Sequence, residues 1–223
     1  MSTPVDIEET VEKLPAPANF VHLRVHSEFS LIDGIVRIKD LVKSAANDHM
    51  PAVALTDQSN MYALIKFYKA ALGAGVKPII GADIWLENEE DPVSPFRLTL
   101  LAQNKVGYRH ISEIISQAYS HNQHHDKAVV RKEWLFERSE GIIVLSGFRD
   151  GDVGQQIIKG NLNIAETLLA HYVEHFGDRF YLELQRTGRE NEEIVIKATM
   201  GLASKLTVPV VATNDVRFIE HCN

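Results

Sequence analysis

The sequence predicts an α/β fold in which seven short strands, most of them followed by a helix, close into a (β/α) barrel. Short β-branched apolar runs alternate with longer stretches of helical spacing, which favours parallel strands buried on both faces. Polar side chains also gather where the predicted strands end. Side chains from the carboxyl ends of many strands converge on one point only when the sheet closes, so a barrel is favoured over an open sheet.

The elements follow one another in a regular order along the chain. Strands are predicted over residues 20–27, 51–58, 76–86, 97–104, 141–147, 179–186 and 208–215. Helices are predicted over residues 35–50, 61–75, 107–120, 131–139, 151–160, 161–177 and 191–206. An acidic loop with two prolines is expected at residues 87–96, and a polar, histidine-rich loop at residues 121–128.

The composition is that of one globular domain. Prolines break the first stretch, so we expect a flexible lead-in over residues 1–18 and the barrel domain over residues 19–223. The net charge of −7, without a run of lysines or arginines, disfavours direct grip on a DNA backbone. A single cysteine, Cys222, no signal peptide and no run of about 20 apolar residues predict a cytoplasmic protein without a membrane segment.

The polar strand ends form a candidate metal site. One imidazole and four carboxylates are predicted there, from His26, Asp33, Asp57, Asp83 and Asp215. Oxygen ligands together with an imidazole suit Zn, Mn or Fe in a hydrolytic centre. The alternative is that each aspartate caps a helix or holds a turn, which suits Asp57 well. His22 lies two positions before Arg24 and is expected to face the same way, as a ligand neighbour or as barrel filling.

Several long phrases resemble the PHP (polymerase and histidinol phosphatase) domain of bacterial DNA polymerase III alpha subunits. They include "FVHLRVHSEFSLIDG", "AVALTDQSNMYALIKFYKAALGAGVKPIIGADIWL", "YLELQRTGR" and "PVVATNDVRFI", in the family's order from about residue 20 to residue 219. The resemblance implies a distorted seven-stranded, TIM-like barrel. In active relatives it implies a pocket with several metal ions that performs phosphoesterase or proofreading exonuclease chemistry.

The resemblance is uneven at the positions where the family places its ligands. The first histidine of the family's H-x-H is Arg24, and the second is His26. Carboxylates are kept as Asp33, Asp83 and Asp215, with Asp83 standing where the family has a glutamate. Other ligand positions are substituted, by Gln58, Arg97, Phe148 and Arg217. The resemblance thus leaves His26, Asp33, Asp83 and Asp215 as residual candidates, with His22 and Asp57 as neighbours, and implies no metal or one weakly bound Zn, Mn or Mg.

The substitutions share a physical theme. An arginine stays protonated and has no lone pair to offer, so it cannot bind a cation. Guanidinium groups from Arg24, Arg97 and Arg217 facing three carboxylates could replace the positive charge of the metals as an ion-pair network. We therefore expect the catalytic centre to be inactive.

The resemblance implies the N-terminal part of a much longer DNA-directed DNA polymerase, a nucleotidyltransferase of DNA replication. Palm, fingers and thumb do not fit in 223 residues. The expected role is structural, with docking of the proofreading exonuclease (epsilon) subunit, and with DNA met only through the full holoenzyme. The alternative is an active metal-dependent phosphoesterase or 3'-5' exonuclease with a reduced metal set. An unrelated barrel enzyme would need a phosphate-binding glycine loop near the last strands, which the sequence lacks.

Overall fold

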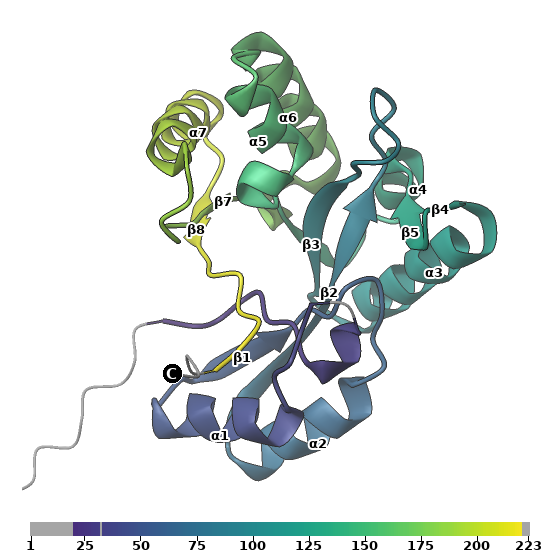
Figure 1. The fold of residues 1–223 in the computed structure, drawn as a ribbon, viewed down its shortest axis with the longest axis vertical. Helices are drawn as coiled ribbons and strands as arrows, with labels where there is room; N and C mark the ends of the chain where they lie inside the picture. Colours follow the sequence, from purple (N-terminus) through teal and green to yellow (C-terminus); the bar gives the residue numbers. More distant parts are fainter. Residues whose placement is uncertain (1–19, 32, 220–223) are drawn as a thin grey trace, which may run out of the picture.

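The structure is a computed structural model that describes residues 20–31 and 33–219. The predicted lead-in over residues 1–18 and Cys222 lie outside the described residues. Helices cover a central sheet in which the long strands β2 and β3 link a smaller lobe, with α1 and α2, to a larger lobe (Figure 1). None of the described helices is long and apolar enough to cross a membrane.

The strands are short except for the central pair. They are β1 (Ala52–Leu55), β2 (Lys77–Leu86), β3 (Phe96–Ala102), β4 (Gln123–His124), β5 (Lys127–Val130), β6 (Ile142–Leu145), β7 (Phe180–Leu184) and β8 (Val210–Ala212). Their sheet runs in the order β4-β5-β2-β3-β6-β7-β8, and β1 also pairs with β2.

The helices lie close to the predicted ranges. They are α1 (Ile38–Asn47), α2 (Leu64–Gly73), α3 (Lys105–His121), α4 (Lys132–Glu137), α5 (Asp152–Ile158), α6 (Leu162–Phe176) and α7 (Glu192–Leu206). Short 3₁₀ turns are η1 (Glu28–Ser30), η2 (Phe148–Asp150) and η3 (Gly177–Arg179). Asn104 caps α3 by accepting hydrogen bonds from the N–H groups of Val106 and Gly107, which explains why this helix begins where it does.

The sequence pattern predicted parallel βα units, and the strand directions agree with this only in part. Strand β3 runs antiparallel to both β2 and β6, whereas β1–β2, β6–β7 and β7–β8 are parallel. The physical reason is the connection between β2 and β3, residues 87–95, which contains no helix. A short connection joins neighbouring strands only as a hairpin, because a parallel crossover needs a dozen or more residues.

The histidine-rich segment also differs from the predicted loop. Residues 123–124 and 127–130 form the antiparallel pair β4–β5, joined through His125 and Asp126, which both have positive φ. Two central residues with positive φ match the twist of a tight hairpin, and an aspartate tolerates this conformation better than most residues. The segment is therefore a structured hairpin at the edge of the sheet.

The first predicted strand, residues 20–27, is held by single bridges and not by a regular ladder. Val25 bridges Val216, and Ser27 bridges Val36. Backbone N–H groups of Ala54 and Thr56 donate to the carbonyls of His22 and Val25, so this segment lies beside β1. The regular sheet contains neither this segment nor residues 213–217, so the ladders themselves do not show a closed barrel.

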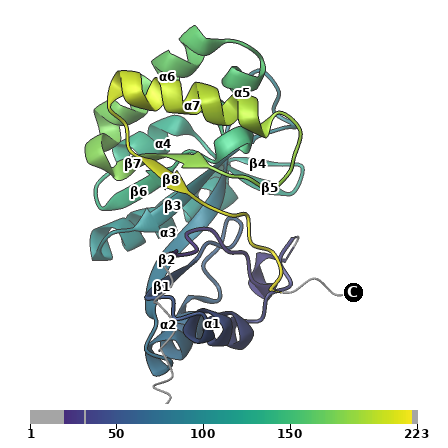
Figure 2. The same ribbon diagram turned by 90° about the vertical axis from the view of Figure 1, so that its left-hand side faces the viewer.

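The core has two large apolar clusters. The larger one packs β2, β3, β6 and β7 against α3, α5, α6 and α7 and includes Leu98, Ile111 and Phe180. The smaller one packs β1 against α1 and α2 around Val53 and Phe67. Figure 2 shows α1 and α2 beneath the sheet and α5 to α7 at the other end of the molecule. The chain from β8 to residue 217 passes between these two lobes, and the polar residues gather beside it.

Candidate functional site

Two neighbouring backbone segments place the centre of the site. The parallel bridge between Val25 and Val216 sets their flanking residues side by side. Because side chains alternate along an extended chain, Arg24 and His26 face the same way, as do Asp215 and Arg217. The site thus begins as a backbone register that brings two arginines, one histidine and one aspartate together.

His26 lies between two carboxylates. Its Nδ1 is 2.8 Å from Asp33 Oδ1 and its Nε2 is 2.8 Å from Asp83 Oδ2. Ser30 donates to Asp33 Oδ1 over 2.8 Å, which fixes that carboxylate after η1. A neutral imidazole would point one lone pair at a carboxylate oxygen, so this geometry favours the ring with both nitrogens protonated.

The pKa of His26 agrees with this assignment. Burial opposes the charged ring, but the hydrogen bonds to Asp33 and Asp83 outweigh burial and raise the pKa of His26 above its ordinary value. A protonated imidazole has no lone pair for a metal ion. In this arrangement His26 acts as a cation that joins two aspartates.

Arg24 lies at the bottom of the site and is almost fully buried. Its Nε donates to Asp83 Oδ2 over 2.8 Å and is 3.6 Å from Asp215 Oδ1. Burial opposes the charge of Arg24, but Asp83 outweighs it and raises the pKa of the guanidinium. In turn, Arg24 and His26 overcome the burial of Asp83 and hold the pKa of that carboxyl well below its usual range.

Arg217 lies at the solvent-exposed side of the site. It grips Asp215 with both sides of its fork, Nε to Oδ2 at 3.0 Å and Nη2 to Oδ1 at 3.1 Å, and its Nη1 also contacts Asp33. A two-pronged pair of this kind fixes geometry as well as charge. Burial opposes the ionisation of Asp215, but Arg24 and Arg217 prevail and lower its pKa.

Arg97 enters from β3. Its Nη2 donates to Gln58 Oε1 over 2.6 Å, is 3.4 Å from Asp33 Oδ2, and its guanidinium lies 4.9 Å from the centre of the Trp85 ring. Gln58 also donates to the backbone oxygen of Asp83. Three guanidinium groups, from Arg24, Arg97 and Arg217, therefore face three carboxylates, from Asp33, Asp83 and Asp215.

The remaining predicted residues have local contacts. Asp57 accepts hydrogen bonds from the backbone N–H and the hydroxyl of Ser27, at 2.6 and 2.9 Å, so it holds a turn. Burial raises the pKa of Asp57. Phe148 is buried in the larger core cluster. The His22 ring packs edge-on against Phe20. Burial lowers the pKa of His22, partly offset by Asp48, the C-cap residue that follows α1.

Polar side chains at the end of β7 form hydrogen bonds outside the charged site. Gln185 donates to the hydroxyl of Thr213, and Thr187 donates to Glu192 at the start of α7. Thus these residues connect strands to neighbouring elements.

Sequence reasoning missed Glu183 on β7, which is fully buried beside the site. It accepts from the N–H of Gly147 at 2.5 Å and the hydroxyl of Thr213 at 2.7 Å. Burial raises the pKa of Glu183, although Arg24 acts against this. The available signal was a carboxylate inside the apolar strand "YLEL", where an exposed position is not expected. Thr99, which donates to Asp83 from β3, was missed for lack of any such signal.

A divalent ion has one candidate position among the described residues. His26, Asp83 and Asp215 each offer a ligand atom, and these atoms lie within 4.8 Å of one another. An ion would need ligands at about 2.0–2.2 Å. Asp83 Oδ2 already accepts from Arg24 and His26, and both Asp215 oxygens accept from Arg217. The donor set fits a metal, but the arginines and the protonated His26 compete for the same oxygens.

Known proteins share both the sequence and the fold. Residues 22–187 match the PHP domain. The DNA polymerase III alpha subunit of Pseudomonas aeruginosa is 50% identical over 202 residues, covering 91% of this chain and 17% of the relative. That of Escherichia coli is 47% identical over 201 residues, covering 90% of this chain and 17% of the relative. The matched region is the N-terminal part of these subunits, so the chain spans about a sixth of their length.

Two solved structures share the fold at low sequence identity. One, from Bifidobacterium adolescentis, is described as a putative metal-dependent phosphoesterase, with a TM-score of 0.59, 12% identity and coverage of 91% of this chain and 90% of that one. The other is an amidohydrolase from Chromobacterium violaceum with bound sulfate and no metal, with the same TM-score and identity over 88% and 87% of the two chains. With most of its length matched by one family, from the segment of Arg24 and His26 to β7, this chain belongs to the PHP domain family.

Proposed function

We propose that this chain is the PHP domain of a replicative DNA polymerase III alpha subunit whose metal centre has become an ion-pair network. Its role is structural: it supports the polymerase and docks the separate proofreading exonuclease subunit. The identity of about half of all matched residues to alpha subunits supports the placement in DNA replication. In this proposal the chain meets DNA only through the holoenzyme, in the cytoplasm.

One observation carries the loss of the metal centre. The Arg24 guanidinium donates to Asp83 at 2.8 Å and lies 3.6 Å from Asp215, so it occupies the space between two candidate ligands. Arginine supplies a permanent positive charge there but no lone pair. The carboxylates then need no metal to offset their mutual repulsion, which explains how they persist in a site that lacks several of the family's ligands.

The proposed domain is the distorted seven-stranded barrel of the family. The Val25–Val216 bridge, together with the hydrogen bonds from Ala54 and Thr56 to residues 22 and 25, supports closure between β8 and β1. In this interpretation residues 22–26 act as an irregular strand. The irregular backbone of residues 22–26 accounts for the distortion of the barrel, and it lies at the charged site.

The second candidate is a metal-dependent phosphoesterase or 3'-5' exonuclease with a reduced metal set. The specific observation in its favour is the group of His26, Asp83 and Asp215, whose ligand atoms lie within 4.8 Å of one another. The fold neighbour described as a metal-dependent phosphoesterase adds support. This candidate requires His26 to lose a proton and Arg24 or Arg217 to swing away.

A hydrolysis assay separates the two candidates. The purified chain is incubated with a chromogenic phosphodiester in added Mn²⁺ or Zn²⁺, beside the His26→Ala variant. We expect no turnover above buffer for either protein. Turnover by the parent that His26→Ala abolishes would establish the second candidate. Docking is tested separately, by calorimetric titration of the chain with the proofreading exonuclease subunit, and absence of binding would remove that part of the proposal.

A further inference from the structure

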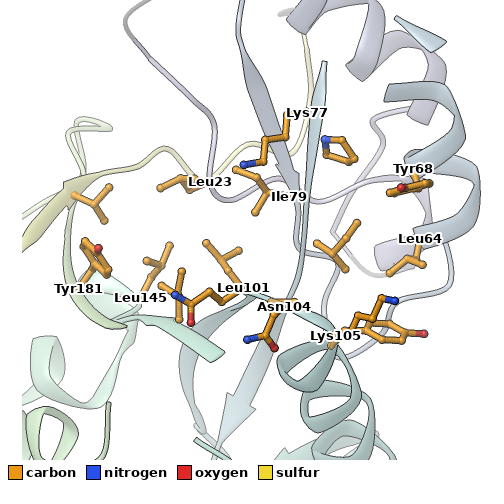
Figure 3. Close-up of a pocket in the computed structure, with 17 residues that line it drawn as sticks. Leu23, Leu64, Tyr68, Lys77, Ile79, Leu101, Asn104, Lys105, Leu145 and Tyr181 are labelled. Carbon is orange, nitrogen blue, oxygen red and sulfur yellow. The ribbon is translucent and has the colours of Figure 1, made fainter. Parts of the chain in front are cut away.

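A large apolar cavity lies at the end of the parallel strands opposite to the charged site. Its volume is about 720 Å³, and it is lined by the start of β2, the end of β3 and residues of β6, β7 and β8. Leu23, Ile79, Leu101 and Leu145 surround the hollow, with Tyr181 on one side and Tyr68 on the other (Figure 3). The parallel strands begin here, whereas Asp57 and Asp215 follow strand ends, so the cavity and the site lie at opposite ends of these strands.

The cavity has a defined charge. Its lining contains two lysines, Lys77 and Lys105, and no acidic residue. Both lysines are exposed and stand with the Tyr68 and Tyr108 rings around the apolar surface. A partner that fits would carry a narrow apolar stripe and a negative charge beside it.

The first residues of the chain carry such a segment. Between residues 5 and 14, Ile7, Val11 and Leu14 follow the spacing i, i+4, i+7, which places them on one face of a helix. The intervening residues carry four acids and one lysine: Asp6, Glu8, Glu9, Glu12 and Lys13. The pattern is complementary to the cavity in both hydrophobicity and charge.

The segment is also tethered within reach. Leu23 lines the cavity, and the described chain begins three residues earlier, at Phe20. The six residues from Leu14 to Phe20 span at most about 20 Å when extended. A tether this short gives the segment a high effective concentration at the cavity, which favours it over a free ligand.

We propose that residues 5–14 bind in this cavity as an amphipathic helix, with Ile7, Val11 and Leu14 against the apolar lining and the acids beside Lys77 and Lys105. The N-terminal segment then covers the end of the sheet opposite to the charged site. This proposal is independent of whether the charged site binds metal.

Paramagnetic NMR on the full chain tests the proposal. A nitroxide is attached at Thr10→Cys in a Cys222→Ser background, and the Leu and Ile methyl signals are recorded. We expect loss of the Leu23, Ile79 and Leu101 signals, with the Leu169 signal on α6 retained. Replacing Ile7, Val11 and Leu14 by serine in the same chain should restore the lost signals, whereas the matched control Val5→Ser, off the stripe, should not.

Two further arms examine charge and connectivity. The double variant Lys77→Glu and Lys105→Glu should weaken the signal loss, because each new glutamate would repel the acids of the segment. Losing two exposed ion pairs lowers the affinity about fivefold. Mixing nitroxide-labelled chains with isotope-labelled, nitroxide-free chains should cause no loss. Signal loss in that mixture would assign the cavity to a second copy and overturn the proposal, as would intact Leu23, Ile79 and Leu101 signals in the labelled parent.

Discussion

The two ends of the parallel strands are lined by opposite kinds of side chain. At the carboxyl ends, charged groups fill the space and hydrogen bonds join His26, Asp33 and Asp83 in one network. At the amino ends, leucine, isoleucine and tyrosine side chains line a cavity of about 720 Å³. The comparison teaches that ion pairs occupy the space at one end, whereas the other end leaves an apolar cavity that, in our proposal, a further chain segment fills.

The largest effect is expected from removing the carboxylate at the centre of the charged end. Asp83→Ala leaves Arg24 and His26 buried without their shared partner, and breaking a buried pair costs about 3–5 kcal/mol of unfolding free energy. Urea denaturation of both proteins measures the difference. As a control, Glu193→Ala removes an exposed partner of Arg186 and should change stability by less than about 1 kcal/mol. Equal losses in the two variants would contradict the account.

A paired leucine truncation probes the apolar end. Leu98 on β3 is fully buried in the larger core cluster, so Leu98→Ala should cost about 3–5 kcal/mol of unfolding free energy. Leu101, three residues on, borders the cavity. In a chain with Ile7, Val11 and Leu14 replaced by serine, Leu101→Ala should cost less, about 2 kcal/mol, because the cavity side of Leu101 then lacks packing partners. The same substitution should cost more in the parent chain, where the proposed segment packs on Leu101, and equal losses in the two chains, in the same denaturation assay, would contradict the proposal.

A smaller loss is expected at the mouth of the charged end. Arg217→Ala leaves Asp215 and Asp33 with fewer partners, and because the site is partly exposed there we expect a loss of about 2 kcal/mol. For a chain of this size this corresponds to a melting temperature lower by about 4–8 °C. Arg217→Lys keeps the charge but not the fork, so it should fall between the two. A variant Arg217→Ala as stable as the parent in metal-free buffer would refute the guanidinium network.

The smallest expected effect is the change in unfolding free energy per pH unit. The pKa values of Asp33, Asp83 and Asp215 are lowered in the folded chain, so the unfolded chain binds more protons in acid. Their contribution is complete above the unfolded pKa of about 3.9 and is lost as the pH falls through the folded values. Each such group changes stability by up to about 1.4 kcal/mol per pH unit in that range.

A second carboxyl acts in the other direction. The pKa of Glu183 is raised, so its contribution is present below its unfolded pKa and is lost as the pH rises through the folded one. Urea denaturation between pH 7 and pH 2 measures the Glu183 effect and the beginning of the aspartate effect. Asp83→Asn should flatten the acid loss, and Glu183→Gln should make it larger at pH values just above the unfolded pKa of a glutamate, about 4.3. The reverse pattern would mean that the two charges are assigned wrongly.

The sequence predicted the helices well because each has its own apolar spacing. Helices α1, α2 and α6 lie within the ranges expected for them, whereas α3 begins two residues before its predicted range because Asn104, assigned to the preceding strand, caps it. Strand direction was predicted wrongly for β3, because direction depends on the connection and not on the strand itself. The histidine-rich hairpin was missed, since its turn depends on positive φ at His125 and Asp126.

In the site, too, local residue types were predictable and contacts between distant segments were not. Residue types alone indicated that Arg24, Arg97 and Arg217 cannot bind metal, and the structure gives their distances to the three aspartates. That His26 bridges Asp33 and Asp83 follows only from tertiary contacts across 57 residues of chain. Glu183 escaped notice because burial of a carboxylate is decided by Gly147 and Thr213, which come from two other segments. Pairing between distant segments is the information that one sequence lacks.

The metal content of the purified chain tests the central claim most directly. The chain is produced in medium with Zn²⁺ and Mn²⁺, desalted, and analysed by elemental mass spectrometry. With Arg24 between Asp83 and Asp215, and His26 protonated on both nitrogens, the account predicts far less than one divalent ion per chain. Near-stoichiometric Zn or Mn that is lost in His26→Ala would contradict it and would show that the guanidinium groups have not taken the place of the metal.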